Sequence, residues 1–178
     1  MSSYITTSSK IHFTPFSPDP EQIVIRDIAH ALSLMTRANG HFPEFYSVGQ
    51  HCIHCYEEAV ARKYSPFLCK ACLLHDASEA YLADITRPVK QFLPSYLEIE
   101  KRLQDTIYEK FLGRVPTETE QTAISSVDDT LLYYEFDHYM GEKLMEQAPL
   151  LVTDPAFETL PFAQVEQEFL DLFATLTV

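Results

Sequence analysis

Basic residues are scarce in this chain. Its 13 Lys and Arg stand against 26 Asp and Glu, which gives a formal net charge of -13 at pH 7. This balance argues against a nucleic acid polymer as partner, because affinity for a phosphate backbone comes from Lys and Arg side chains. A small anionic substrate remains compatible with an acidic chain if a bound metal ion supplies a local positive field.

Long apolar runs are missing as well. No stretch approaches the roughly 20 residues that a membrane-spanning helix needs, and residues 1–10 contain Ser and Thr without the apolar core of a signal peptide. We therefore expect no membrane association and a cytoplasmic location. Internal repeats and low-complexity segments are also lacking. A length of 178 residues with 46% hydrophobic content fits one domain, residues 1–178.

Cysteines are few, but their spacing needs an explanation. Cys52 and Cys55 form one Cys-x-x-Cys pair, and Cys69 and Cys72 form a second, which together mimic a structural zinc site. Both pairs lie inside runs of helical period without the flanking Gly or Pro of a zinc knuckle. We interpret them as small core residues and expect no disulfides; a zinc-ribbon interaction protein is a remote alternative.

Hydrophobic periodicity predicts a chain of helices separated by proline and glycine. Residues 1–22 are expected to form an irregular lead-in with an edge strand near residues 11–13. Ser47, Pro66 and Thr117 are predicted helix starts, and Gly113 a helix end. Helices are predicted over about residues 27–37, 48–63, 66–76, 96–112, 117–139 and 162–176, with a short helix or turn at 87–92 and a loop at 149–161. The predicted fold class is all-α, a compact helical bundle.

The stretch 73–84 has the strongest chemical signal. His75 and Asp76 stand side by side behind a buried apolar run, and Glu79 and Asp84 follow. A neutral imidazole beside a carboxylate suits a divalent cation, and a cation beside spare carboxylates suits hydrolysis. At a helix C-terminus His is favourable but Asp is not, which favours a ligand role over a structural one.

Two further side chains can join this pair. His51 shares a predicted helix face with buried Val48 and Cys55, and Asp128 lies beside buried Val127. Helices of a bundle place one or two ligands each around a shared centre. The predicted site therefore holds one divalent metal ion (Mn, Co, Fe, Ni, Zn or Mg) between His51, His75, Asp76 and Asp128, with Asp129 as the alternative last ligand.

This order of ligands resembles the H…HD…D signature of the HD-domain metal-dependent phosphohydrolases. Within that superfamily it is closest to the small nucleotide hydrolases, which include bacterial 5'-deoxynucleotidases and phage dATP triphosphohydrolases. The resemblance covers about residues 27–135 and implies a bundle of the HD-domain type. It rests on the segments Phe45-Tyr-Ser-Val-Gly-Gln-His51, His75-Asp-Ala-Ser-Glu-Ala-Tyr-Leu-Ala-Asp84 and Arg87-Pro-Val-Lys90.

Roles for other residues follow from the resemblance. It implies that Glu79 orients or deprotonates the attacking water, and that Asp84 handles the leaving group or the sugar. A metal lowers the pKa of water and a nearby carboxylate can take the proton, and Glu79 would share the face of the two ligands before it if that helix continued. Arg37 takes the place of a basic residue that grips phosphate, and Arg87 or Lys90 adds positive charge.

Aromatic residues near the ligands in sequence are candidates for stacking on a base. Tyr46 and Tyr81 are the substrate-binding candidates, although such residues are more often core; Phe42, Phe45 and Ile85 have the same ambiguity. His54 is interpreted as structural, and the roles of His30 and His41 stay open.

The resulting expectation is a metal-dependent phosphohydrolase that releases phosphate from a deoxynucleotide or nucleotide, similar to a 5'-nucleotidase. A dNTP triphosphohydrolase with the same site is an alternative within enzymes. A non-catalytic nucleotide-binding or regulatory module is an alternative from another class. The resemblance also implies a homo-oligomer, a dimer or larger.

Overall fold

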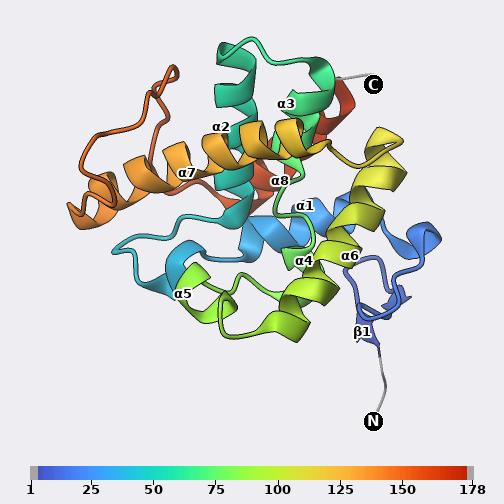
Figure 1. Cartoon of the computed structure of the whole chain (residues 1–178). Coiled ribbons are helices and arrows are strands. Elements are labelled where there is room, and N and C mark those ends of the chain that lie inside the picture. The colour runs from blue at the N-terminus through green and yellow to red at the C-terminus, as the bar shows by residue number, and fades with distance from the viewer. Residues whose placement is uncertain (1–3, 176–178) are drawn as a thin grey trace.

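Helix α2 (Val48–Ala61) lies at the centre of the molecule (Figure 1). In this computed structural model, which describes residues 4–175, it contacts α1 (Ile25–Leu34), α3 (Pro66–Leu73), α7 (Glu118–Met140) and α8 (Phe162–Thr175). The other elements are β1 (Ile5–Thr6), β2 (His12–Phe13), the 3-10 helices η1 (Pro20–Gln22) and η2 (Arg37–Gly40), α4 (Glu79–Leu82), α5 (Arg87–Lys90) and α6 (Pro94–Leu112). The predicted all-α class is confirmed. In the described part of the chain, every helix is too short or too polar to cross a membrane.

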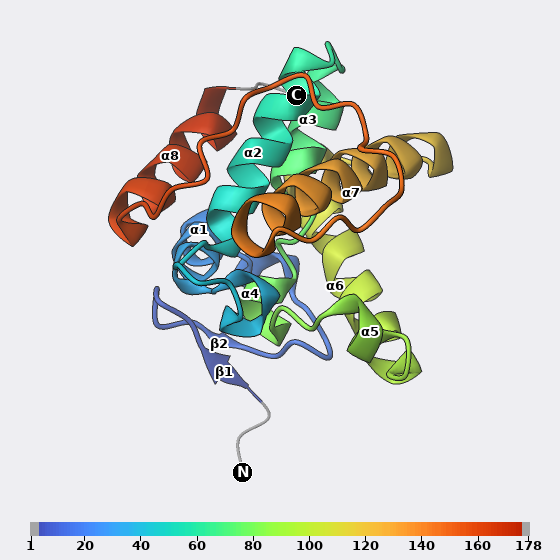
Figure 2. The ribbon, with the colours of Figure 1, turned by 90° about the vertical axis from the view of Figure 1, so that its left-hand side faces the viewer.

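The start of α2 explains how tightly its neighbours approach. Ser47 and Gln50 form a reciprocal capping box, which confirms the predicted helix start. At Gly49 an added Cβ would lie 3.0 Å from Val165 Cγ1 on α8 and 3.1 Å from the backbone nitrogen of Ser33 on α1. A side chain here would therefore push apart three helices that meet at this point. Figure 2 shows α8 and α7 on opposite sides of α2.

Helix α3 begins as predicted but ends early. Ser65 caps it, with Pro66 at its first position. The expected continuation into His75 and Asp76 is wrong, because the helix ends at Leu73 and a series of turns leads to α4. The ring of His75 caps the end, since its Nδ1 lies 2.8 Å from the Cys72 carbonyl oxygen, one of the last-turn carbonyls that an ending helix leaves free.

Helix α1 also ends before its predicted boundary. It stops at Leu34, so that Arg37 belongs to η2. The Arg37 N–H donates to the Tyr46 carbonyl at 2.9 Å, and the Val48 N–H donates to the Met35 carbonyl at 2.9 Å. The chain after α1 is therefore held extended against the segment that leads into α2, and this pairing replaces the last helical turn.

The later boundaries follow the sequence closely. Gly113 ends α6 with φ +78°, a conformation that suits glycine. Thr117 and Glu120 form a capping box at the start of α7, which Gly141 ends. The predicted strand near residues 11–13 is β2, paired antiparallel with β1. Residues 1–3 of the predicted lead-in and residue 176 of the predicted last helix lie outside the described residues.

A long connection joins α7 to α8 and is fixed by one buried carboxylate. Glu58 on α2 accepts hydrogen bonds from the backbone N–H groups of Val152 and Thr153, from the Thr153 hydroxyl and from Arg62. In Figure 2 this connection runs past α2 and α3 before it reaches α8. The predicted loop at 149–161 is confirmed.

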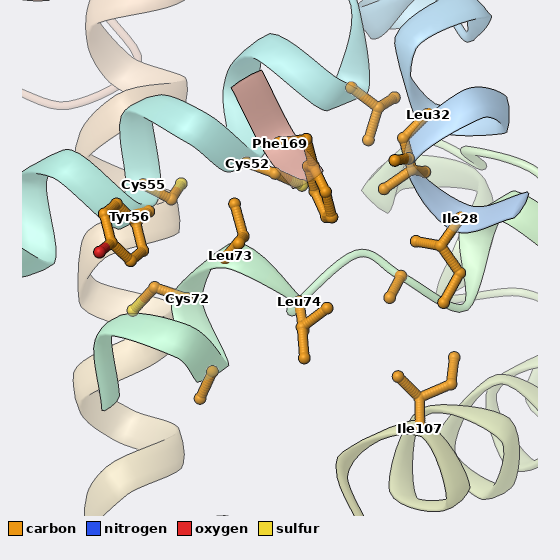
Figure 3. Close-up of a cluster of buried hydrophobic side chains, with 14 of the residues drawn as sticks. Ile28, Leu32, Cys52, Cys55, Tyr56, Cys72, Leu73, Leu74, Ile107 and Phe169 are labelled. Carbon is orange, nitrogen blue, oxygen red and sulfur yellow. The ribbon is translucent and has the colours of Figure 1, made fainter. Parts of the chain in front are cut away.

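The main core lies between α1, α2, α3, α6, α7 and α8, and Figure 3 shows part of it. All four cysteines are buried free thiols, as the core interpretation predicted. Cys52 and Cys55 come from α2 and Cys72 from α3, among apolar side chains that include Leu73 and Phe169.

Candidate metal centre

Two imidazole rings face each other in the interior, next to two aspartates that line a cavity. His51 on α2 is fully buried, and its Nδ1 lies 2.5 Å from Glu135 Oε1. The Nδ1 of His75 lies 2.8 Å from the Cys72 carbonyl oxygen. Both partners are acceptors, so each ring carries its hydrogen on Nδ1 and presents the Nε2 lone pair. The two Nε2 atoms lie 3.2 Å apart. Two facing lone pairs repel each other unless a proton or a metal ion lies between them.

Two carboxylates complete a set of four possible ligands. Asp76 Oδ2 lies 3.2 Å from His75 Nε2 and 3.9 Å from His51 Nε2. Asp128 Oδ1 lies 3.1 Å from His51 Nε2 and 3.8 Å from His75 Nε2. Ligands bonded to one ion at about 2.0–2.2 Å lie about 3.3–3.5 Å from one another in a tetrahedral arrangement. The spacing and the mixed nitrogen and oxygen chemistry therefore fit a divalent transition metal.

These ligands come from separate parts of the chain. His51 belongs to α2, His75 and Asp76 to the turn after α3, and Asp128 to α7. The structure thus brings together all four residues of the predicted set. Asp129 does not join them, since its Oδ1 pairs with Arg87 at 2.5 Å.

The charges of the carboxylates suit a cation. Burial raises the pKa of Asp76, but the His75 ring and Arg37 outweigh burial and hold it below its ordinary value. Burial also raises the pKa of Asp128, but the adjacent rings of His51 and His75 outweigh burial and hold it well below its ordinary value. For Glu135 the effect of burial is outweighed by His51 and Arg37, and the pKa falls to about 2. All three carboxylates are therefore ionised near neutral pH.

Glu135 was not among the predicted site residues. It orients His51 and also accepts from Arg37, with Oε2 3.4 Å from Nη2. A carboxylate that holds the second nitrogen of a metal-binding histidine fixes the ring and its tautomer. Its spacing was a usable signal, because Glu135 follows Asp128 by two helical turns and so lies on the same face of α7.

Arg37 lies between the ligands and the cavity. Its Nη1 is 3.5 Å from Asp76 Oδ2, and the side chain is buried. Burial lowers the pKa of Arg37, but Glu135, Asp76 and Asp128 raise it well above its ordinary value. The guanidinium is therefore a fixed positive charge beside the metal ligands, where the sequence predicted a phosphate contact.

A cavity of about 410 Å³ opens beside this centre. The polar part of its lining holds most of the predicted site residues, namely Arg37, Asp76, Glu79, Asp84, Arg87, Lys90 and Asp128. Its apolar part is formed by Ala38, Phe42, Ile85, Pro88, Leu132, Phe136 and Leu144. The sequence prediction missed Leu132 and Phe136, although they follow Asp128 at intervals that share its helix face.

Glu79 is a carboxylate of the cavity with one buried oxygen that lacks a hydrogen-bond partner among the described residues. Its Oε1 accepts from Lys90 at 3.2 Å, and among residues 4–175 its buried Oε2 has no hydrogen-bond partner. Burial raises the pKa of Glu79 well above its ordinary value, and Asp76 and Asp84 add to this effect. The expected helical link to His75 and Asp76 is absent, but Glu79 at the start of α4 still reaches their cavity.

The other basic residues of the cavity are already paired. Arg87 donates to Asp128 Oδ2 at 2.6 Å, in addition to its contact with Asp129. Lys90 donates to Glu100 at 2.6 Å as well as to Glu79. Burial raises the pKa of Asp84. Arg87, Lys90 and Asp84 thus lie where predicted, with the two cations partly neutralised.

Two predicted substrate contacts lie elsewhere. Tyr46 is fully buried, and its hydroxyl is 2.8 Å from His54 Nδ1. Tyr81 packs on Phe13 with ring centroids 4.3 Å apart. Neither tyrosine lines the cavity, because both rings turn into the core. Phe42, an alternative candidate, does line it.

The other histidines lie outside the centre. Burial lowers the pKa of His54 to about 4, in keeping with its structural interpretation. His30 Nδ1 pairs with Glu166 at 2.9 Å, and His41 is exposed.

Thiols also reach the imidazoles. His51, Cys55 and His75 form one group, and Cys52, His75 and Asp76 a second, in each of which the possible ligand atoms lie within 4.8 Å of one another. The cysteines therefore group with histidines rather than with each other. Together with the carboxylates, these residues define an all-α protein with a buried His/Cys/Asp centre that can hold a metal ion.

The chain is similar to two known proteins, both of which are uncharacterized. No family model matches the chain. It is 32% identical over 167 residues to the uncharacterized protein RCAP_rcc00048 of Rhodobacter capsulatus, covering 85% of this chain and 84% of that protein. The chain therefore belongs to the same family as RCAP_rcc00048. It is also 39% identical over 109 residues to the uncharacterized protein YfdR of Escherichia coli, a match that spans 58% of YfdR and 61% of this chain.

Proposed function

We propose that this protein is a metal-dependent phosphohydrolase that releases phosphate from a nucleotide, most simply a deoxynucleoside 5'-monophosphate. The observation that carries the proposal is the convergence of His51, His75, Asp76 and Asp128 in one cluster. Its two aspartates line a cavity that also holds a buried arginine and Glu79, whose Oε2 has no hydrogen-bond partner among the described residues. The same four residues carry the resemblance to the HD-domain phosphohydrolases.

Each part of the centre has a chemical task. The imidazoles and the two aspartates would hold the ion, which would act as a Lewis acid and lower the pKa of water. Glu79 takes the proton from water, since its Oε2 has no competing partner among the described residues. Arg37 keeps its charge and faces the phosphate.

The remaining lining suits a small molecule. A cavity of about 410 Å³ falls in the range of about 300–1,000 Å³ typical of ligand sites. Phe42 and Phe136 give it an aromatic wall, with ring centroids 5.2 Å apart, against which a base can pack. Asp84 is the acceptor for a sugar hydroxyl or for the leaving oxygen.

The charge balance favours a monophosphate over a triphosphate. Arg87 is held by two aspartates and Lys90 by two glutamates. Arg37 is the most buried of the three cations and is also shared, with Asp76 and Glu135. Little positive charge is therefore left for a triphosphate, which brings several negative charges. A non-catalytic binding module is less well supported, because a buried carboxylate oxygen without a hydrogen-bond partner, such as Glu79 Oε2, costs stability unless it has a task.

A substrate screen tests the proposal. The chain is stripped with a chelator, reloaded with Mn, Co, Ni, Zn or Mg, and offered deoxynucleoside and nucleoside mono- and triphosphates. We expect inorganic phosphate from monophosphates with at least one metal. Release of inorganic triphosphate would select the triphosphohydrolase instead, and binding without turnover would select the binding module. An absence of both binding and turnover would overturn the proposal.

A further inference from the structure

The two thiols of α2 lie against the metal-binding imidazoles on a side that the proposed reaction does not use. Cys55 Sγ is 3.5 Å from His51 Nε2, and Cys52 groups with His75. Asp76 and Asp128 line the cavity, whereas neither cysteine does. Oxygen donors thus approach the two rings from the cavity, and sulfur donors approach them from the core.

The spacing of the sulfur donors matches a metal site. For tetrahedral zinc, bonds of about 2.3 Å to sulfur and about 2.0–2.1 Å to nitrogen place the two donors about 3.5–3.6 Å apart, and two nitrogens about 3.3–3.4 Å apart. The observed separations are 3.5 Å from Cys55 to His51 and 3.2 Å between the rings. Cys52 groups with His75 and Asp76 instead, so the sulfur-containing set around both rings has three donors, His51, His75 and Cys55.

We propose that His51, His75 and Cys55 form a second metal site for thiophilic ions such as Zn²⁺ or Cd²⁺, which overlaps the oxygen-rich site. Thiolates favour such ions, whereas carboxylates favour Mn²⁺ or Mg²⁺. Both sites use the same Nε2 atoms, so only one is filled at a time. Binding breaks the S–H bond, the sulfur lone pair bonds to the metal, and the proton leaves to solvent.

This second site has a consequence for function. An ion held by Cys55 and the two imidazoles does not use Asp76 or Asp128, the two ligands that line the cavity. Thiophilic ions therefore compete with oxygen-preferring ions for the imidazoles and withdraw the metal from the cavity. Binding of thiophilic ions at this site does not depend on the proposed hydrolysis, and it is measured without an activity assay.

X-ray absorption on the zinc-loaded wild-type protein tests the site directly. We expect sulfur scatterers at about 2.3 Å from the zinc, in addition to nitrogen and oxygen scatterers at about 2.0 Å. A spectrum with nitrogen and oxygen scatterers alone would overturn the proposal, and this result needs no variant. Cobalt gives a second readout, since a thiolate ligand to Co²⁺ adds a charge-transfer band in the near ultraviolet.

Variants identify the sulfur. Cys55→Ser should remove the charge-transfer band or weaken it, and should lower Cd²⁺ affinity by about tenfold or more, the scale on which changes to a ligand shell act, while Mn²⁺ affinity stays unchanged. Cys69→Ser is the matched control, because this buried thiol bonds to the Tyr64 carbonyl instead of an imidazole. Equal Cd²⁺ affinity in wild type and Cys55→Ser, with both folded by circular dichroism, would overturn the proposal.

Discussion

Glu135 on α7 and His51 on α2 are 84 residues apart in sequence, and their Oε1 and Nδ1 atoms lie 2.5 Å apart. Both side chains are fully buried. The contact fixes the hydrogen of His51 on Nδ1, and so turns the Nε2 lone pair toward His75. A single long-range hydrogen bond thereby joins two of the central helices and prepares one nitrogen for a metal ion.

Replacing Glu135 should weaken metal binding without touching a ligand. Glu135→Gln removes the negative charge that holds the ring, and we expect the affinity for Mn²⁺ or Co²⁺ to fall by about 10- to 100-fold. Calorimetric titration of the metal-free protein measures this change. Glu142→Gln, on an exposed residue just after α7, is the control and should bind as wild type. Unchanged affinity in Glu135→Gln would mean that His51 needs no charged partner.

The adjacent aspartates of α7 allow a matched comparison. Both form an ion pair with Arg87, but only Asp128 contacts the imidazoles. Asp128→Asn should therefore lose metal in elemental analysis after dialysis, while Asp129→Asn should retain it. Since each change removes one Arg87 contact, loss in both variants would assign the effect to Arg87 rather than to ligation.

Local signals in the sequence predicted most of the fold. Ser47, Pro66, Thr117 and Gly113 mark helix boundaries through side-chain caps and backbone conformation that involve neighbours only. The ends of α1 and α3 were missed for a different reason. Each end depends on a contact made by residues beyond the helix, such as the contact of the His75 ring with the Cys72 carbonyl. Hydrophobic periodicity does not report such contacts, so it cannot predict where these helices end.

The site was predictable where residue chemistry is unusual and unpredictable where it depends on packing. An Asp beside buried Val127 needs a partner, so Asp128 was assigned correctly to the cluster. Tyr46 and Tyr81 were chosen for closeness in sequence to the ligands. Their rings instead turn to His54 and to Phe13, contacts that arise from how the helices pack. Cys55 was interpreted as a core residue, and its burial confirms this. The interpretation did not include its contact with His51.

The proposed proton acceptor can be separated from the ion pair that holds it. Lys90 contacts Glu79 and Glu100, but only Glu79 lines the cavity. Glu79→Gln should keep its metal and lower the rate of phosphate release by about 10²- to 10⁴-fold, the usual contribution of a general base. Glu100→Gln, which loses a contact to the same lysine, should retain most of the activity. Equal loss in both variants would point to Lys90 instead.

Acid should loosen the connection between α7 and α8 through Glu58. Burial raises the pKa of Glu58, but hydrogen bonds from Arg62, Thr153 and Val152 outweigh burial and lower it. A lowered folded-state pKa contributes stability that is complete above the unfolded value, about 4.3, and is lost as pH falls through the folded value. Glu58→Gln should thus reduce the free energy of unfolding by roughly 2 kcal/mol at pH 7.

Urea titrations at pH 7 and at pH 3 measure this difference. The gap between wild type and Glu58→Gln should shrink at the lower pH, because pH 3 lies below the unfolded value, in the range where the contribution of Glu58 is being lost. Glu57 is the contrast on the same helix: it is exposed, but partial desolvation and the nearby Glu168 raise its pKa, so its contribution is lost as pH rises. Glu57→Gln should therefore raise stability at pH 7 relative to wild type. A gap for Glu58→Gln that is the same at both pH values would show that its hydrogen bonds do not depend on charge.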